Sequence, residues 1–430
     1  MAGFFRSYFQ RFFVMLFFPF SLIAQYKMPT DTLQQWFYQG NYHQMLKALS
    51  NKIDRGDSVS ANLYYLGGMA WRHLLNEQKA LLYFENAVKR DSSNLQYLFA
   101  LGRSYSSLSH FKEAAEIFHK ILQTDSTHYG ARLGLAECYF VQQQYQKALP
   151  IYQILLQQDS SNTFIHRRLA SCALKIGDVF TAIRFYQQAL KINPYDLESA
   201  LPLVKLLLKK SALDTALYVV EKSLRYHPNS LPLLKMRANI LFKKESYSAA
   251  IPYFRRLVQL GDSSARTLRQ LGICLLYADS LTRAVAVLTQ ALQHDSLAAF
   301  SHFYLGVAYK EQEEFDRAGY HLQKAIDLAM PNFIGEFYIQ LGSAFELQLN
   351  YPRAIKAYKS TLKFDPSKKI IYFYLASLYD SYYADKQVAL LYYRKFLQQD
   401  HNSPKTFRNY ARARIKKLIE TIHFQNGQQQ

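Results

Sequence analysis

A pattern of residue sizes recurs every 34 residues along most of this chain of 430 residues. In a frame that starts at Ala61, the eighth place is nearly always small and the twentieth place holds alanine in eight successive periods. The eighth place is occupied in turn by Gly68, Gly102, Ala136, Ala170, Val204, Ala238, Gly272 and Gly306. Recurrence at a period of this length indicates a chain of small helical or stranded units that bury their apolar faces against one another.

Each period contains two apolar stripes of helical spacing. In the period from Leu95, the first stripe is Leu98, Leu101 and Tyr105, and the second includes Phe118. Spacings of three and four residues place such side chains on one face of a helix. Small residues at places 8 and 20 allow two helices to approach closely, and the large residue at place 24 fills the space beside them. Each period therefore predicts a packed pair of helices.

The segments between periods carry helix-boundary residues. The sequence Asp-Ser-Ser-Asn occurs at residues 91–94 and 159–162, and prolines stand at Pro194, Pro228 and Pro366. Asp, Ser and Asn cap the start of a following helix, and proline does not continue a preceding one. These residues predict that each period ends where its second helix ends.

The pattern resembles the tetratricopeptide repeat family. The motif of that family has leucine at place 7, a small residue at place 8, tyrosine at place 11, alanine at place 20 and an aromatic residue at place 24. The period from Leu95 matches all five places, with Leu101, Gly102, Tyr105, Ala114 and Phe118. The resemblance extends over nearly all of the chain after its first residues.

This resemblance implies an all-α fold, a right-handed superhelical solenoid of stacked antiparallel helix pairs. We expect a degenerate N-terminal repeat or cap at residues 25–60, about ten units over residues 61–403, a capping helix at 404–424 and a disordered tail at 425–430. Val204 and Leu207 depart from the motif at places 8 and 11, so the period that contains them matches less well.

The first 24 residues form a separate segment. Arg6 and Arg11 accompany an apolar run from Phe12 to Ala24, and the segment contains no acidic residue. This arrangement predicts a secretory signal peptide that is cleaved after Ala24. The chain is then exported to the periplasm, or is associated with the outer membrane, of a bacterium. An uncleaved N-terminal anchor is the alternative, although the run is shorter than the ~20 residues of a membrane-spanning helix.

The sequence lacks four short motifs that are typical of catalysis or metal binding. There is no phosphate-binding glycine loop, no HExxH, no GxSxG and no paired CxxC. We therefore predict no catalytic residue, no cofactor, no metal site and no enzymatic activity. Cys138, Cys172 and Cys274 all fall at place 10, which favours a small buried apolar position over a disulfide.

The family resemblance implies a concave surface lined by places 2, 5, 9, 12 and 13 of each first helix. These places are mixed in the early units, as at Arg72 and Glu137, and become basic in the central ones. The predicted partner-binding residues are Arg167, Lys175, Lys205, Lys209, Lys235, Asn239, Lys243, Arg266 and Arg269. The net charge of +20 leaves a second interpretation open, in which lysine and arginine cover every exposed face.

The predicted function is that of a non-enzymatic scaffold or adaptor of the bacterial cell envelope. It would bind a protein or peptide partner in the concave groove. If the basic residues form the binding surface, that partner would be acidic. Two alternatives remain: an electrostatic binder of an anionic envelope polymer, and a regulatory subunit of an enzyme supplied in trans. Nucleic acid is disfavoured as a partner, because the chain is expected to be exported and most of its aromatic residues fall at core places.

Overall fold

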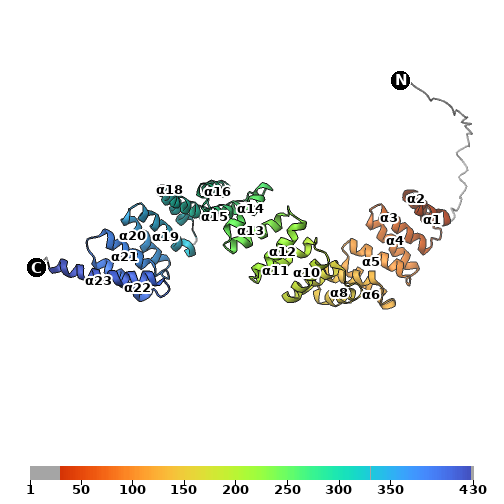
Figure 1. Cartoon of the computed structure of the whole chain (residues 1–430). Helices are drawn as coiled ribbons and strands as arrows, with labels where there is room; N and C mark the ends of the chain where they lie inside the picture. The colour runs from red at the N-terminus through yellow and green to blue at the C-terminus, as the bar shows by residue number, and fades with distance from the viewer. Residues whose placement is uncertain (1–29, 330, 428–430) are drawn as a thin grey trace, which may run out of the picture. The chain divides into compact units, whose positions relative to one another are not determined.

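The computed structural model describes residues 30–329 and 331–427, and all regular structure in these ranges is α-helical. The described residues form 23 helices and no strand, which confirms the all-α prediction (Figure 1). The predicted signal peptide at residues 1–24 lies outside the described residues, as do residues 428–430 at the end of the predicted tail.

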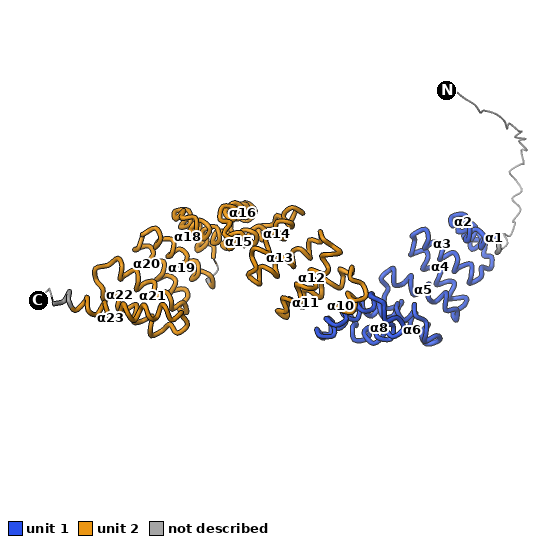
Figure 2. The backbone as a smooth tube through the Cα atoms, in the orientation of Figure 1, with its two compact units in different colours: residues 1–185 blue, residues 186–430 orange. Residues whose placement is uncertain are grey.

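The helices divide between two compact units, residues 1–185 and 186–430 (Figure 2). Unit 1 contains α1 (Thr30–Tyr38), α2 (Tyr42–Asp54), α3 (Ala61–His73), α4 (Glu77–Arg90), α5 (Leu95–Ser107), α6 (Phe111–Thr124), α7 (Tyr129–Val141), α8 (Tyr145–Gln158) and α9 (Thr163–Ile176). Helix α10 (Val179–Ile192) crosses the boundary. Unit 2 contains α11 (Leu197–Lys209), α12 (Leu213–Tyr226), α13 (Leu231–Lys243), α14 (Tyr247–Gln259), α15 (Ala265–Tyr277), α16 (Leu281–His294), α17 (Ala299–Glu311), α18 (Phe315–Leu328), α19 (Pro331–Leu347), α20 (Tyr351–Phe364), α21 (Ile371–Tyr382), α22 (Gln387–Gln399) and α23 (Lys405–Gly427).

From α3 onward each period is one helix pair, as the repeat predicts. We call the first, odd-numbered helix of a pair the A helix and the second, even-numbered helix the B helix. In unit 1, α5 packs against α6, and α6 packs in turn against α7; in unit 2, α15, α16 and α17 follow the same scheme. Each B helix is thus held between the A helix of its own pair and the next A helix along the chain.

The small residue at place 8 contacts the large residue at place 24, as the size pattern predicts. A Cβ atom on Gly68 would lie 2.6 Å from the Phe84 ring, and one on Gly272 would lie 2.5 Å from Leu288 Cγ. Real Cβ atoms do not approach so closely, so these glycines are required by volume alone. The alanines at place 20 are fully buried beside them.

The three cysteines lie at place 10 inside this core. Cys138, Cys172 and Cys274 are buried free thiols, which confirms the prediction of a small apolar position. Burial raises the pKa of Cys172 and of Cys274 to about 12. Both therefore stay protonated and behave as small apolar side chains.

The turn between the A and B helices has the same backbone geometry in each period. Place 15 adopts a positive φ in successive pairs, at Leu75, Ser109, Gln143, Gly177, Ser211, Glu245, Asp279, Glu313 and Leu349. Only glycine adopts this conformation without steric cost. The turn is therefore set by the packing of the two helices and not by the residue that occupies it.

Two helices depart from the regular pairs. Helix α19 has 17 residues where the preceding A helix α17 has 13, and it contains the two extra residues that interrupt the sequence frame. Helix α23 covers the predicted capping segment and the start of the predicted tail, and Arg414 donates two hydrogen bonds of 2.8 and 2.7 Å to Asp380 of α21. No helix among the described residues has the length and apolar character needed to cross a lipid bilayer.

Candidate partner-binding surface

The predicted binding residues all belong to A helices. Neighbouring A helices contact one another within each unit, as α5 does with α7 in unit 1 and α11 does with α13 in unit 2. The residues that face away from the B helices therefore form a continuous surface over several A helices of one unit. We call this the A-helix surface. Whether a charged side chain there is available to a partner depends on the contacts that it already makes.

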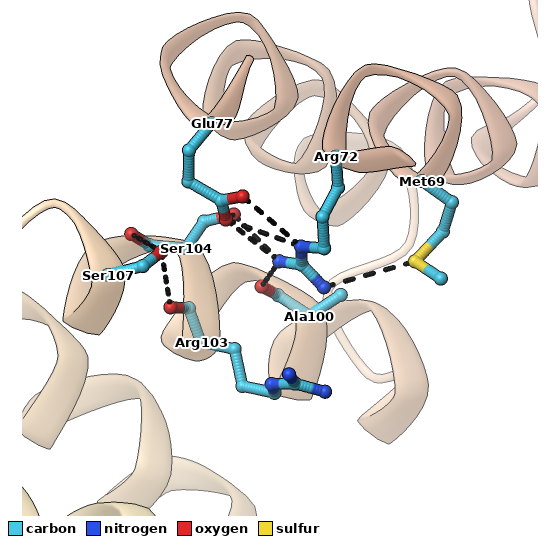
Figure 3. A network of polar contacts seen from close by, with 7 residues as sticks. All are labelled: Met69, Arg72, Glu77, Ala100, Arg103, Ser104 and Ser107. Atoms are coloured by element: carbon cyan, nitrogen blue, oxygen red, sulfur yellow. Dashed lines mark hydrogen bonds and ion pairs between the residues drawn. The ribbon is translucent and has the colours of Figure 1, made fainter. Parts of the chain in front are cut away.

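Arg72, at place 12 of α3, is fully engaged in contacts within unit 1. Its guanidinium donates to Glu77 Oε1 at 3.1 Å, to the Ala100 carbonyl oxygen at 3.1 Å and to Ser104 Oγ at 2.9 Å (Figure 3). Ser104 in turn donates to Glu77 Oε1 at 2.6 Å. Burial by itself would raise the pKa of Glu77, but the hydrogen bonds from Ser104 and Arg72 outweigh it and lower that pKa. Arg72 thus ties one repeat to the next.

Place 12 has a similar role elsewhere. Lys310 donates to Gln340 Oε1 of the next A helix at 3.0 Å, and Ser106 lies 3.6 Å from the buried Cys138 thiol. Place 13 is one residue further on, rotated by about 100° around the helix. The residues at place 13 from Ser107 through Leu347 are all exposed. Place 12 therefore faces the following repeat and place 13 faces solvent.

Four of the predicted residues in unit 2 are exposed. Lys205 and Lys209 lie one turn apart on α11, Lys243 ends α13, and Arg266 begins α15. None of the four forms an ion pair within the described residues. Helices α13 and α15 contain no acidic residue, and the acidic residue of α11 is Glu198 in its first turn, so cations outnumber acids on these three helices.

Lys235 and Asn239 of α13 already have partners in the next repeat. Lys235 Nζ lies 3.0 Å from Asp262 Oδ2, and Asn239 Oδ1 accepts a hydrogen bond of 2.8 Å from Gln270 Nε2. Burial by itself would raise the pKa of Asp262, but hydrogen bonds from Lys235 and Ser264 lower it. These two predicted residues join α13 to the repeat that follows it.

Arg269 of α15 is half-buried. Burial lowers its pKa, and the positive charge of Arg266 lowers it further. The carboxylate of Asp295 acts in the opposite direction and raises the pKa of Arg269, so the charge of this arginine is partly compensated within the fold.

The two predicted residues of unit 1 differ in their surroundings. Arg167 is partly buried on α9, 5.8 Å from the Phe164 ring centroid. Lys175 is exposed and lines a hollow of about 400 Å³ together with Tyr145 and Lys147 at the start of α8. Of these two residues, Lys175 at place 13 is the exposed one.

Unit 1 contains a polar cluster that was not predicted from the sequence. Glu137, expected on the concave surface, accepts from Arg168 Nε at 2.8 Å and from Arg168 Nη2 at 2.6 Å. The buried Tyr152 hydroxyl donates to the same carboxylate, and burial together with that negative charge raises the pKa of Tyr152. The separation of Glu137 from Arg168, close to one period, is the signal that could have revealed the pair.

The structure also brings together two histidines from separate helices. His302 Nδ1 of α17 lies 3.0 Å from His321 Nδ1 of α18, and the two rings stack. Burial lowers the pKa of both side chains, that of His321 to about 4. The described residues contain no group of three His, Cys, Asp or Glu side chains arranged to hold a metal ion.

Two segments of the chain match models of known protein families. Residues 269–333 match a family model described as tetratricopeptide repeat. This segment of the chain is therefore similar to tetratricopeptide repeats. Residues 73–155 match a second model, described as anaphase-promoting complex, cyclosome, subunit 3. No curated protein matches the sequence.

Solved structures of similar proteins cover different shares of the chain. A crystal structure of YrrB, described as a TPR protein with an unusual peptide-binding site, is 23% identical over 41% of this chain and 91% of its own, with a TM-score of 0.38. The Cut9–Hcn1 hetero-tetramer of the APC/C is 15% identical over 90% and 88%, with a TM-score of 0.42. A tetratricopeptide repeat protein from Parabacteroides merdae is 14% identical over 58% and 98%, with a TM-score of 0.40.

Proposed function

We propose that this protein is a non-enzymatic scaffold that binds an acidic segment of a partner protein on the A-helix surface of unit 2. The observation that carries the proposal is the set of four exposed cations Lys205, Lys209, Lys243 and Arg266 on α11, α13 and α15. A solenoid of helix pairs presents one broad surface made of side chains from many helices, which suits an extended partner segment.

The exposure of these cations matters for binding. A cation already paired inside the fold, such as Lys235 with Asp262, must lose that pair before it can bind a partner. An exposed lysine makes a new ion pair without that loss, although each such pair contributes only about 0.2–1 kcal/mol. Several carboxylates on one partner segment are therefore needed, and the binding will weaken as salt screens them.

We further propose that the chain acts outside the cytoplasm, as an adaptor of the bacterial cell envelope. The basis is the sequence of residues 1–24, with two arginines, an apolar run and no acidic residue. Fractionation of cells that express the full chain tests this part separately. Recovery of an N-terminally shortened chain in the periplasmic or outer-membrane fraction supports export, and recovery of the intact chain in the cytoplasm refutes it.

The binding proposal is tested with a charge-reversed variant, Lys209→Glu combined with Lys243→Glu. The full chain and this variant are used to capture partners from an envelope extract at low and high salt. We expect the wild type to retain one stoichiometric protein and the variant to lose it. The matched control is Arg225→Glu combined with Arg283→Glu, which reverses two charges on B helices. Equal capture by both double variants would refute the role of the A-helix surface.

An anionic envelope polymer is a second candidate, favoured by a specific feature of the sequence. Residues 351–430 contain fifteen Lys and Arg but five Asp and Glu. Capture of polydisperse anionic material that is released by salt, with no stoichiometric protein, would support this candidate. Capture of an enzyme whose rate changes on binding would instead support a regulatory subunit.

A further inference from the structure

The B-helix side of unit 2 contains a hollow that the repeat pattern does not predict. It lies between α18 and α20, over α19, and has a volume of about 600 Å³. Pockets that hold small ligands or peptide side chains fall in the range of ~300–1,000 Å³. Its aromatic wall includes Phe315 and Tyr320 of α18 and Phe345 of α19.

The hollow opens where one side chain is missing. Place 21 of the B helix holds Leu81, Ala115, Leu149, Ile183, Leu217, Ile251 and Val285 in the seven preceding periods, but Gly319 in α18. In the repeat of α8, Leu149 packs against a cluster that includes Ile165 and Leu169 of the next A helix. Gly319 leaves the corresponding space over α19 empty, and it lines the hollow.

Nothing in the fold requires glycine at this place. A Cβ atom on Gly319 would meet only Phe345 Cε1, at 3.7 Å, which is an ordinary contact. By comparison, the glycines at place 8 would clash at 2.5–2.8 Å. Glycine inside a helix costs about 1 kcal/mol relative to alanine. Gly319 is thus destabilising for α18 without a packing reason, and its effect is to keep the hollow open.

Cations line the other side of the hollow. Helix α20 contains no acidic residue, and its Arg353 and Lys356 are exposed and line the hollow. The Arg353 guanidinium lies 5.7 Å from the Phe345 ring centroid. The one carboxylate in the lining, that of Asp316, accepts a hydrogen bond of 2.8 Å from Gln348 Nε2. The hollow therefore combines an aromatic wall with a net positive rim.

We propose that this hollow is a peptide-binding site for an acidic segment that inserts one aromatic side chain. The aromatic ring would occupy the space left by Gly319, against Phe315 and Phe345. Carboxylates on the flanking residues of the segment would pair with Arg353 and Lys356. This site does not depend on the A-helix surface, because all of its lining residues belong to α18, α19, α20 and the turn after α19.

The test is selection of random dodecapeptides on a display library against the full chain. We expect enrichment of peptides with one aromatic residue flanked by at least two Asp or Glu. The dissociation constant of an enriched peptide is then measured by fluorescence anisotropy. Gly319→Leu restores the usual side chain at place 21 and fills the hollow, so it is expected to weaken binding about tenfold or more.

Matched variants separate the hollow from folding and from charge in general. Gly319→Ala adds only a methyl group, stabilises α18 and is expected to change the dissociation constant by less than about twofold. Arg353→Glu combined with Lys356→Glu is expected to abolish binding. Lys324→Glu combined with Lys363→Glu reverses two exposed charges of α18 and α20 outside the hollow and is expected to retain most of it.

Three results would overturn the proposal. The first is the absence of an enriched acidic and aromatic class, and the second is binding that survives Gly319→Leu. The third is binding lost with Lys209→Glu and Lys243→Glu but not with Gly319→Leu, which would place the peptide on the A-helix surface. A single-stranded oligothymidylate probe is run in parallel. If no peptide binds, but the oligothymidylate binds to the wild type and not to Gly319→Leu, the hollow is a nucleic-acid site instead.

Discussion

Arg72 in unit 1 and Lys243 in unit 2 belong to different repeats and occupy adjacent places of the repeat motif, yet Arg72 is engaged in contacts and Lys243 is exposed. Arg72, at place 12, contacts Glu77, the Ala100 carbonyl and Ser104. Lys243, at place 13, is exposed and ends its helix. A rotation of about 100° separates a residue that holds two repeats together from one that is available to a partner. In this chain the place of a cation in the repeat decides which role it has.

The largest effect is expected for Arg72→Ala. The arginine and Glu77 side chains are only 20% and 22% exposed, so removal of the guanidinium leaves a largely buried carboxylate without its partner. Loss of one member of such a pair is expected to cost about 2 kcal/mol, less than for a fully buried pair. Because repeat proteins can unfold in parts, hydrogen exchange of the α3–α5 amides is the appropriate measurement. Unchanged exchange in the variant would contradict the role of Arg72.

A smaller and pH-dependent effect is expected for Glu77→Gln. The pKa of Glu77 is lowered below its ordinary value of 4.5 in the folded protein, so the folded state favours the carboxylate. The stabilisation is complete above pH 4.5 and is lost as the pH falls through the lowered folded pKa. At neutral pH the variant is expected to be about 1 kcal/mol less stable than the wild type.

The same titration supplies the contradiction test. The difference in unfolding free energy between wild type and Glu77→Gln is measured from pH 7 downward, with Glu116→Gln on the exposed face of α6 as the control. The difference should shrink below pH 4.5 for Glu77 and stay near zero for Glu116. A difference that grows as the pH falls would contradict the lowered pKa of Glu77 in the folded state.

The sizes of the packed side chains could be predicted from the sequence, but the polar partners of the charged side chains could not. The contact between Gly68 and Phe84 follows from places 8 and 24, because a packed interior fixes the sizes of the residues that touch. Whether a charged side chain is paired or exposed depends on which polar group of the next repeat lies beside it. Lys235 meets Asp262 and Asn239 meets Gln270, and both partners lie about one period downstream. Without a fixed angle between repeats, the sequence does not distinguish these pairs from exposed residues.

The hollow beside Gly319 was unpredictable for a related reason. The glycine at place 21 is visible in the sequence, but a glycine in a helix can also be a packing requirement, as at Gly272. Only the 3.7 Å distance to Phe345 shows that the position has room. The direction in which a missing side chain would have pointed is a property of the fold and not of the repeat frame.

Lys235 is intermediate between Arg72 and Lys243, because it forms an ion pair that is more exposed than that of Arg72. Its side chain is 43% exposed while that of Asp262 is 20% exposed, so solvent screens the pair partly. Lys235→Ala is expected to reduce the unfolding free energy by about 0.5 kcal/mol, and high salt should remove most of this difference. Hydrogen exchange of the α13–α15 amides measures it. A loss of unfolding free energy as large as that of Arg72→Ala would mean that the exposure of an ion pair does not determine its contribution to stability.

The smallest effect on stability is expected at place 13, where the effect on binding should be greatest. Lys209→Ala and Lys243→Ala remove exposed cations that form no ion pair in the described part of the chain, so each should change the unfolding free energy by less than about 0.5 kcal/mol. Chemical denaturation followed by circular dichroism measures this, and capture of the partner by the same variants measures binding. If either variant lowers the unfolding free energy by more than this, whether or not capture is also lost, places 12 and 13 do not have separate roles. Loss of capture without loss of stability is the result that the separation requires.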